Sequence, residues 1–289
     1  METIWTELMG SEFRVSFYDA KGVRTRCIEA GNGKAMIFLH GTGGHAEAYA
    51  RNVAAHAEHF HVYALDMVGH GYTDAPALDY GFEDFAVFIG DFLDAIGAKK
   101  AYLSGESLGA MVASAFALKA PERVEKLVLN TGMLIPPNEK GRQELIDVLE
   151  RSRAASGAPT REAVRKRLEW LMLDPQKSVT DELVEVRYRI YSQPGRAAVM
   201  RKISERILGD LVAPEFAEYA TPGKLKQLAC PTLVLWTEHN PGQPLELARE
   251  GEQMLPNSQL HVMKNSAHWP QWEEPEEFNR VHIAFLLGK

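Results

Sequence analysis

The chain has 289 residues, 45% of them hydrophobic and 25% charged, which is the composition of a globular protein. Its formal net charge of -7 argues against a nucleic-acid-binding protein, because such proteins need a concentrated basic surface. Cys27 and Cys230 have no metal-ligand spacing and favour a reducing compartment, the cytoplasm, over a structural disulfide. No stretch approaches the roughly 18 apolar residues of a membrane span, and the N-terminus has no signal-peptide pattern.

Strands and helices alternate in the first half of the chain. Residues 13–19 and 23–29 surround a short turn and predict an N-terminal hairpin. Helical spacing of apolar residues predicts helices at 82–98 and 107–120. Short apolar runs that suit strands buried on both faces occur at residues 35–40, 61–66, 101–106 and 125–130. This alternation predicts an α/β fold with a mostly parallel central sheet and helices on both faces.

The pattern changes after Gly132. Residues 133–224 are rich in Arg, Glu and Leu at helical spacing, with breaks at SGAPT, LDPQ, QPG and ATPG. The earlier alternation then returns, with strands predicted at 232–236 and 259–263 and helices that begin at Leu245 and Pro275. We therefore expect a core domain made of residues 1–132 and 225–289, with residues 133–224 inserted as a helical lid.

The middle segment carries an excess of positive charge. Between Lys140 and Asp210 there are 15 Lys and Arg against 11 Asp and Glu, so this segment is +4 and the remainder is -11. One interpretation is a set of solvated helical faces. The other is a cationic lid over a site that takes an anionic substrate.

The motif G-x-S-x-G occurs from Gly105 to Gly109, between a predicted strand and a predicted helix. In that setting the motif forms a nucleophile elbow, a strained turn that presents the hydroxyl of Ser107 for attack. The flanking glycines remove side chains that would collide in the turn. The bare pattern also arises by chance, but its neighbours here favour a catalytic serine.

A Gly-rich segment, residues 40–44, follows a predicted buried strand. Its backbone can approach a ligand closely, so we predict an oxyanion hole formed by N–H groups of Gly41 or Thr42 together with that of Leu108. Phosphate binding is the alternative use of such a loop. The chain lacks both a G-x-G-x-x-G motif that opens a helix and a Walker-type Gly-Lys-Ser/Thr motif, which argues against a nucleotide site.

His268 follows the last predicted strand, where an elbow enzyme places its base. We predict that it takes the proton of Ser107 and returns it to the leaving group. Most of the other histidines, such as His56, His59 and His61, lie where a packing or solvent role suffices.

Four segments together resemble the α/β-hydrolase superfamily: HGTGG, LDMVGHGYTD, GESLG and AHWPQWEEPEEFN. The resemblance covers nearly the whole chain, and the last segment is similar to the meta-cleavage-product hydrolases. Those enzymes cleave a carbon–carbon bond in dienoates made by ring fission of catechols. The resemblance implies an α/β-hydrolase fold and serine-dependent hydrolysis of a 2-hydroxy-6-oxo-dienoate in aromatic compound degradation. It also implies a small carboxylate substrate, no metal or organic cofactor, and a homodimer as a candidate assembly.

The resemblance also implies two substrate-binding residues, Arg187 in the lid and Trp269 after His268. A family arginine that faces the substrate cavity matches Arg187, and a planar guanidinium recognises a carboxylate bidentately. The alternative is that Arg187 and Arg189 pair with Glu182 or Glu185 on the helix surface. The sequence leaves both interpretations open.

The chain departs from the family at the acid of the catalytic triad, where it has Asn240. The amide oxygen of Asn240 can accept a hydrogen bond from His268 but brings no charge, and its NH2 group would favour the wrong tautomer. Glu238 is the alternative acid. We predict a pair of Ser107 and His268 oriented by Asn240, with Glu238 kept as a displaced acid.

Two further positions bear on this departure. Asn130 and Thr131 follow the preceding strand, where some superfamily members place their acid, and neither is ionisable in the useful range. An asparagine found near the oxyanion loop of family members falls on Ala48, which puts details of the subfamily mechanism in doubt.

Other functions use the same residues. An esterase or lactonase would share Ser107, the oxyanion loop and His268, and would differ in the shape of its pocket. A slow or inactive ligand-binding module on this fold is a second alternative, because the triad acid is missing. Epoxide hydrolases and haloalkane dehalogenases are disfavoured, since these relatives carry an aspartate where this chain has Ser107.

Overall fold

A computed structural model describes residues 3–157, 159–212 and 222–289. Its centre is an eight-stranded sheet with the strand order β1-β2-β4-β3-β5-β6-β7-β8. The strands are β1 (Phe13–Ala20), β2 (Val23–Ala30), β3 (Ala35–Leu39), β4 (His61–Leu65), β5 (Ala101–Glu106), β6 (Val124–Asn130), β7 (Thr232–Thr237) and β8 (Ser258–Met263). The strands β1 and β2 form an antiparallel hairpin, β2 pairs antiparallel with β4, and the remaining neighbours are parallel. The predicted hairpin and the predicted mostly parallel sheet are therefore confirmed.

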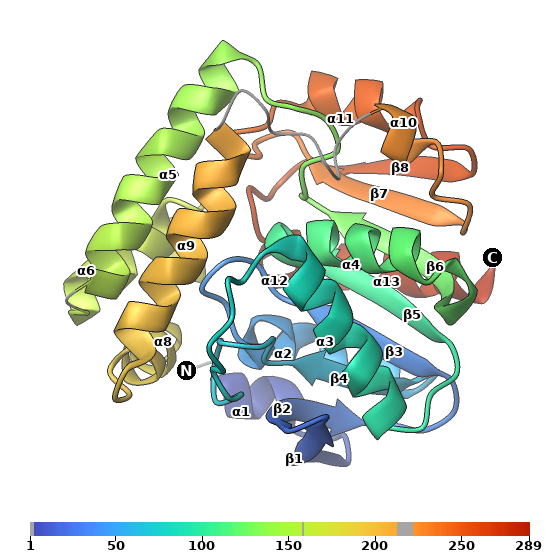
Figure 1. Cartoon of the computed structure of the whole chain (residues 1–289), viewed down its shortest axis with the longest axis horizontal. Coiled ribbons are helices and arrows are strands. Elements are labelled where there is room, and N and C mark those ends of the chain that lie inside the picture. The colour runs from blue at the N-terminus through green and yellow to red at the C-terminus, as the bar shows by residue number, and fades with distance from the viewer. Residues whose placement is uncertain (1–2, 158, 213–221) are drawn as a thin grey trace.

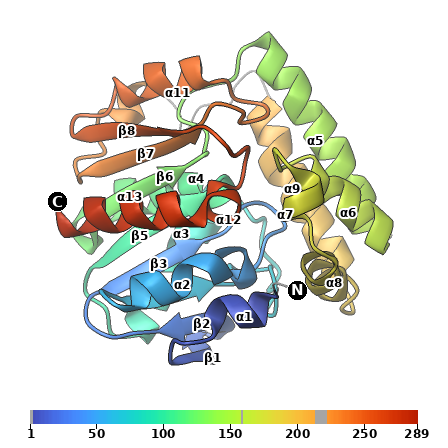
Figure 2. The same cartoon turned by 180° about the vertical axis from the view of Figure 1, so that it is seen from behind.

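Helices cover both faces of this sheet. The helices α3 and α4 lie on the face turned to the viewer in Figure 1, and α2 and α13 lie on the opposite face, which Figure 2 shows. The helices of the core are α1 (Ile4–Leu8), α2 (Ala50–Ala57), α3 (Phe82–Ala95), α4 (Leu108–Lys119), α10 (Pro222–Leu225), α11 (Leu245–Glu252), α12 (Pro270–Glu273) and α13 (Pro275–Leu287), with the 3-10 turns η1 (Ala46–Tyr49) and η2 (Pro121–Arg123).

The helix α2 between β3 and β4 was not among the elements predicted from sequence. Its buried side chains are Ala50, Asn52, Val53 and His56, so its inner face is small or polar and has no large apolar side chain to mark it. The inner face is satisfied by specific bonds: Asn52 Nδ2 donates to Gln271 O at 3.0 Å. Such a helix is recognisable only once its partners are in place.

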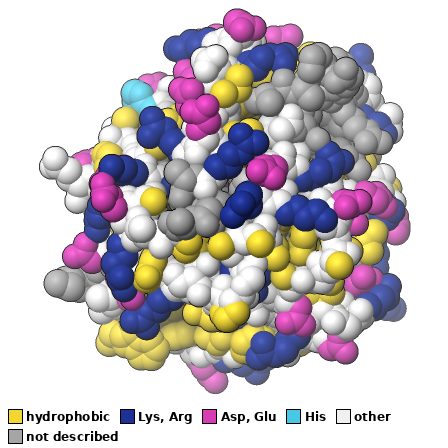
Figure 3. Space-filling model, turned by 60° about the vertical axis from the view of Figure 1, so that its left-hand side comes forward, with side chains coloured by type: hydrophobic (Ala, Val, Ile, Leu, Met, Phe, Trp, Pro, Cys, Tyr) yellow, Lys and Arg dark blue, Asp and Glu magenta, His cyan; other side chains and the backbone are white. Residues whose placement is uncertain are grey.

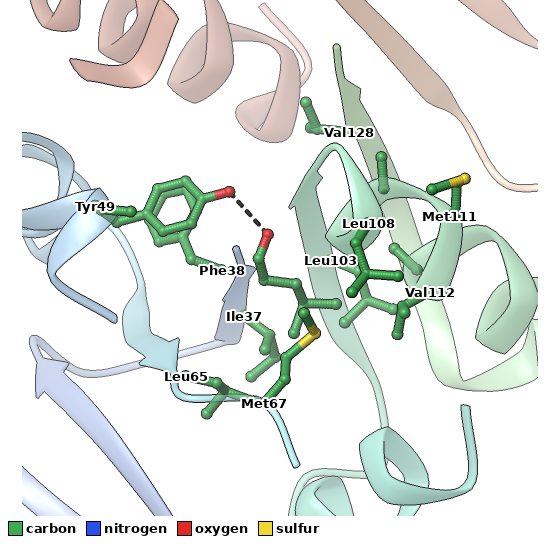
Figure 4. Close-up of a cluster of buried hydrophobic side chains, with 14 of the residues drawn as sticks. Ile37, Phe38, Tyr49, Leu65, Met67, Leu103, Leu108, Met111, Val112 and Val128 are labelled. Carbon is green, nitrogen blue, oxygen red and sulfur yellow. Dashed lines mark hydrogen bonds between the residues drawn. The ribbon is translucent and has the colours of Figure 1, made fainter. Parts of the chain in front are cut away.

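The core lies between the sheet and its flanking helices, and its middle is drawn in Figure 4. Ile37 and Phe38 of β3 meet Leu103 of β5 and Leu108 of α4 there, and all four are fully buried. Burying one such side chain contributes about 1.5–3 kcal/mol. The hydroxyl of Tyr49 donates to the carbonyl of Leu39 at 3.0 Å, at the end of β3. This packing anchors the strand ends from which the site loops begin.

The second group of helices lies together at one side of the sheet (Figures 1 and 2). It comprises α5 (Glu139–Gly157), α6 (Arg161–Glu169), α7 (Pro175–Ser178), α8 (Asp181–Tyr191) and α9 (Arg196–Val212). The break expected at QPG falls between α8 and α9, while the last two residues of LDPQ form the start of α7. SGAPT begins within the end of α5, and parts of SGAPT and ATPG lie outside the described residues. No helix in the described ranges is long and apolar enough to cross a bilayer. The division into core and lid at 133 and 224 stays a prediction.

Much of the charge in this group lies on solvated faces. Figure 3 shows Lys and Arg side chains mixed with Asp and Glu over this side of the molecule. Glu185 of α8 accepts from Arg161 and from Arg189, each at 2.7 Å, and these pairs are exposed. Exposed pairs of this kind contribute little, about 0–1 kcal/mol each. The interpretation as solvated helical faces therefore holds for these residues.

Candidate active site

Ser107 occupies a strained turn between β5 and α4. Its backbone has φ 53° and ψ -115°, a left-handed region that non-glycine residues rarely adopt. A Cβ added at Gly105 would lie 2.0 Å from the backbone of Gly109, and one added at Gly109 would lie 2.1 Å from the carbonyl oxygen of Leu39. The glycines are thus required by close backbone approach, and the turn has the geometry of a nucleophile elbow.

The predicted oxyanion loop follows β3 and is held in place by buried hydrogen bonds. His40 Nε2 accepts from the N–H of Met67 at 3.1 Å, so Nδ1 carries the proton and donates to Gly41 O at 2.8 Å. The hydroxyl of Tyr191, from α8, donates to Gly43 O at 3.0 Å. The loop is therefore tied both to the core and to the helix that carries Arg187.

A residue of the motif LDMVGHGYTD also holds this loop in place. Asp66 is fully buried and accepts from the N–H of Ala46 at 2.8 Å and from the N–H of Tyr72 at 2.9 Å. It also forms an ion pair with Arg26 at 3.0 Å. A carboxylate with this many donors holds the two segments that flank the site in one arrangement.

Gly41 and Thr42 line the same cavity as Ser107, His268 and Asn240. Leu108 is the first residue of α4, directly after Ser107. The structure thus brings the predicted oxyanion residues to the predicted nucleophile. Their role in binding an oxyanion stays a prediction.

Asn240, and not Glu238, contacts His268. The side-chain oxygen of Asn240 lies 2.7 Å from His268 Nδ1, while its NH2 group donates to Gln243 O at 3.4 Å. This orientation makes Nδ1 the protonated nitrogen and leaves the lone pair of Nε2 for chemistry. Glu238 is exposed, which does not support its role as a displaced acid.

The backbone of His268 is fixed by neighbouring elements. Its N–H donates to Leu171 O at 2.9 Å, and its carbonyl accepts from the hydroxyl of Thr131 at 2.9 Å. Thr131, which follows β6, thus supports the base through its backbone. Burial, together with the positive charge of Arg167, lowers the pKa of His268 to about 3, so the ring is neutral at pH 7.

One site residue was missed by the sequence reasoning: Glu106, the last residue of β5. It is 1% exposed and lines the cavity, and its Oε1 lies 3.2 Å from His268 Nε2. The contact is close but poorly directed, because neither carboxyl oxygen has a hydrogen-bond partner among the described residues. Burial raises the pKa of Glu106 to about 8. The feature of the sequence that could have indicated Glu106 is the presence of an ionisable residue inside the G-x-S-x-G motif.

Arg187 is buried, unlike its neighbour Arg189. Arg187 is 1% exposed and its guanidinium lies 5.2 Å from the ring centre of Trp269, which lines the cavity. Its Nε and Nη2 have no hydrogen-bond partner within the described ranges. The surface-pair alternative is therefore correct for Arg189, which pairs with Glu185, and wrong for Arg187.

A second buried arginine, Arg167 of α6, was also missed. It is 7% exposed, lines the cavity, and its Nη1 lacks a partner in the part of the chain that the structure describes. Burial, with Arg187 nearby, lowers the pKa of Arg167 to about 10, which still leaves it charged at pH 7. Its helical spacing with Val164 and Leu168, both fully buried, could have indicated an inward position.

The remaining wall of the cavity is apolar and is made largely by Met111, Met133, Leu145, Val148, Trp170 and Leu208. The cavity is narrow, with a volume of about 60 Å³. Ala48, the position that the resemblance matches to a family asparagine, is fully buried and has no polar side chain. The site thus combines a strained serine, a neutral histidine, a buried carboxyl and two buried guanidinium groups.

Comparison with known proteins agrees with this geometry. Residues 34–275 match the alpha/beta hydrolase fold family. The chain is 32% identical to a 2-hydroxy-6-oxononadienedioate/2-hydroxy-6-oxononatrienedioate hydrolase of Burkholderia vietnamiensis, over 98% of each chain. It is 30% identical to a 2-hydroxy-6-oxo-2,4-heptadienoate hydrolase of Pseudomonas putida, over 93% of this chain and 95% of that one.

Among solved structures, a meta-cleavage product hydrolase from Pseudomonas fluorescens IP01 superposes with a TM-score of 0.81 at 28% identity. The match covers 94% of this chain and 97% of that one. The predicted fold is therefore confirmed. The chain belongs to the α/β-hydrolase fold family, as a hydrolase related to those that act on meta-cleavage products.

Proposed function

We propose that this protein hydrolyses a carbon–carbon bond in a 2-hydroxy-6-oxo-dienoate formed by ring fission of an aromatic compound. The observation that carries the proposal is a pair of buried guanidinium groups: Arg167 lines the cavity with Ser107 and His268, and Arg187 lies 5.2 Å from the ring of Trp269 in the cavity wall. Relatives over nearly the whole chain are named as hydrolases of such dienoates, which supports the same assignment.

The unpaired guanidinium of Arg187 needs an anionic partner. Burying a charge without a partner costs on the order of several kcal/mol of stability, and a carboxylate bound to the guanidinium would remove much of that cost. Arg187 packs beside Trp269, whose ring restricts where its charge can point. The carboxylate of a dienoate is a planar anion that matches the guanidinium fork. We therefore assign Arg187 and Trp269 to substrate binding.

The proposed reaction is a retro-Claisen hydrolysis. The dienol first ketonises by moving its hydroxyl proton to carbon, which places a ketone where it can accept the electrons of the bond to be broken. Ser107, or a water that gives its proton to His268, then adds to the distant ketone. N–H groups of Gly41, Thr42 and Leu108 stabilise the resulting oxyanion.

Collapse of this adduct breaks the carbon–carbon bond, and its electron pair leaves as the enolate of the dienoate fragment. The proton held by His268 neutralises the leaving fragment. If Ser107 was the nucleophile, water then hydrolyses the acyl ester on Ser107; if water was the nucleophile, the acid is released at once. By either route the products are a 2-hydroxydienoate and a carboxylic acid.

The cavity is bordered by the core and by α5, α6 and α9, through Leu145, Arg167 and Leu208 respectively. We accordingly treat residues 133–224 as a lid. Because the free volume is only about 60 Å³, and ligand pockets usually measure several hundred, roughly 300–1,000 Å³, a dienoate has to displace lining side chains on entry. A substrate-dependent change in tryptophan fluorescence from Trp170 or Trp269 would report that displacement.

The first experiment follows the visible absorbance of a 2-hydroxy-6-oxohexa-2,4-dienoate mixed with purified protein. We expect rapid bleaching that is abolished in Ser107→Ala. Arg187→Gln should raise KM about tenfold or more, because it removes a charge-assisted contact. Arg189→Gln is the matched control, since it removes the same charge from an exposed position on the same helix.

Two other outcomes would contradict the proposed function, each in a different way. Cleavage of simple esters without bleaching of alkyl or aryl dienoates would refute carbon–carbon hydrolysis and leave an esterase. Absence of both activities would favour a ligand-binding module.

We also propose the cytoplasm as the location, on the evidence that Cys27 and Cys230 are free thiols. Cell fractionation tests this. A homodimer stays a prediction, and light scattering separates it from a monomer of 32.3 kDa.

A further inference from the structure

We infer that Glu106 supplies the negative charge that compensates protonated His268, acting at Nε2 in place of the triad acid that is absent at Nδ1. The inference rests on the proposed chemistry of Ser107 and His268. It does not depend on which bond of the substrate is cleaved.

The first step is the lack of charge on the Nδ1 side. Asn240 orients the ring through its amide oxygen at 2.7 Å but remains neutral when His268 takes a proton. Glu238 is exposed, and Asn130 and Thr131 cannot ionise usefully. The imidazolium formed during catalysis therefore has no counter-ion on that side within the described residues.

The second step is the position of Glu106 on the other side of the ring. Its Oε1 lies 3.2 Å from His268 Nε2, and in the described ranges it is the one carboxylate within ion-pair distance of this histidine. Its other oxygen lies against the backbone of Gly41, where an added Cβ would approach it to 2.5 Å. Both oxygens are buried without a hydrogen-bond partner among the described residues. A side chain so confined can act on little besides His268 and a bound substrate.

The third step concerns what surrounds Glu106. Arg187 of α8 and Arg167 of α6 favour its charged form, as does the nearby N–H of Gly41, while burial opposes it and dominates. The phenol of Tyr49 also lies close, and its own pKa is raised well above the usual value by burial and then by Glu106. The acid therefore keeps its proton at pH 7 and loses it near pH 8.

Proton accounting links this environment to catalysis. Below about pH 8 Glu106 keeps its proton, stays neutral and offers no charge to an imidazolium that forms at His268. Loss of that proton leaves a carboxylate 3.2 Å from Nε2. The proton of Ser107 then moves to Nε2, and the imidazolium forms beside a carboxylate. When His268 passes this proton to the leaving group, the starting state returns and no proton is consumed overall.

The test uses the full-length protein and two readouts. One is the rate at which diisopropyl fluorophosphate phosphorylates Ser107, measured by mass spectrometry. This rate depends on the reactivity of Ser107 and His268 and not on how a dienoate binds. The other is hydrolysis of a dienoate and of a simple ester. In the wild type we expect the rate of Ser107 labelling to rise with pH to a plateau, with a midpoint near 8.

Glu106→Gln keeps the shape of the side chain and removes its charge. Above pH 8, where wild-type Glu106 is charged, we expect it to slow labelling about tenfold or more, the effect of one pKa unit on the reacting base, and to abolish the midpoint near pH 8. Adding Asn240→Asp to this variant should restore most of the lost rate, because charge returns at Nδ1. Glu238→Gln is the control, because it removes an exposed carboxylate from the same loop as Asn240.

Three results would overturn the inference. Labelling of Glu106→Gln at the wild-type rate would show that the carboxyl is not used. Slow labelling without rescue by Asn240→Asp, in variants that melt at the wild-type temperature, would show that its role is not charge compensation. If these variants fail to fold, a wild-type labelling rate that falls or stays flat between pH 7 and 9 would refute the inference directly.

The proposed function can fail separately. Labelling that follows the expected pattern, without bleaching of any dienoate, would refute carbon–carbon hydrolysis and leave the role of Glu106 intact.

Discussion

The hydrogen bond from Tyr191 to Gly43 joins helix α8 to the predicted oxyanion loop, and its removal is a direct test of how the site is held. The donor and acceptor are 3.0 Å apart and both residues are buried. Tyr191→Phe keeps the ring and removes the hydroxyl, so the carbonyl of Gly43 loses its partner. An unsatisfied buried acceptor costs about 1–3 kcal/mol.

The expected change in melting temperature follows from the size of the chain. Unfolding entropy is about 2.1 cal/mol/K per residue, so for 289 residues it is about 0.6 kcal/mol/K. A loss of 1–3 kcal/mol, roughly, then lowers the melting temperature by about 2–5 °C. Because Gly43 adjoins Thr42 of the predicted oxyanion hole, we also expect kcat to fall more than KM rises.

Differential scanning calorimetry and steady-state kinetics measure these effects. Tyr72→Phe is the matched control, since Tyr72 is 41% exposed and no hydrogen bond from its hydroxyl is found in the described residues. An unchanged melting temperature together with an unchanged kcat in Tyr191→Phe would show that the loop is held without this bond, and the reasoning would be wrong.

Three more predictions concern Thr131, Gly105 and the buried histidines His56 and His282. Thr131→Val removes the 2.9 Å hydrogen bond to the carbonyl of His268. It should lower kcat several-fold with little change in KM. Steady-state kinetics that show equal effects on kcat and KM would contradict this prediction. Gly105→Ala places a Cβ 2.0 Å from backbone atoms of α4 and should give little folded protein, so recovery of a wild-type circular dichroism spectrum would count against the strained turn. Burial lowers the pKa of His56 to about 4 and that of His282 well below its usual value. The unfolded chain therefore binds more protons than the folded one below about pH 6.5, and stability should fall between pH 7 and 5 in urea titrations, by about 1.4 kcal/mol per pH unit for each group. Equal stability at both pH values would refute this assignment.

Several features were predictable because they depend on local patterns. The N-terminal hairpin and the central strands follow from short apolar runs between turn residues, and strand β5 has the predicted bounds 101–106. The elbow at Ser107 follows from glycines on either side of one serine, because only that arrangement permits the turn. The sequence alone therefore determined the fold class and the candidates for nucleophile and base, Ser107 and His268.

The tertiary structure decided which of several similar side chains take part in the site. Asn240 and Glu238 lie on one loop, and the sequence could not say which meets His268, because the path of a loop depends on what packs against it. Arg187 and Arg189 are two residues apart on one helix, and only the packing of α8 shows that the first is buried and the second exposed.

Glu106 shows the same limit most clearly. Its place in the elbow motif was visible, but the motif does not state where its side chain points. Its approach to His268 Nε2 joins β5 to the loop after β8, which are 162 positions apart along the chain. Its burial then raises its pKa, and that depends on the desolvation of a folded interior, which local sequence does not encode.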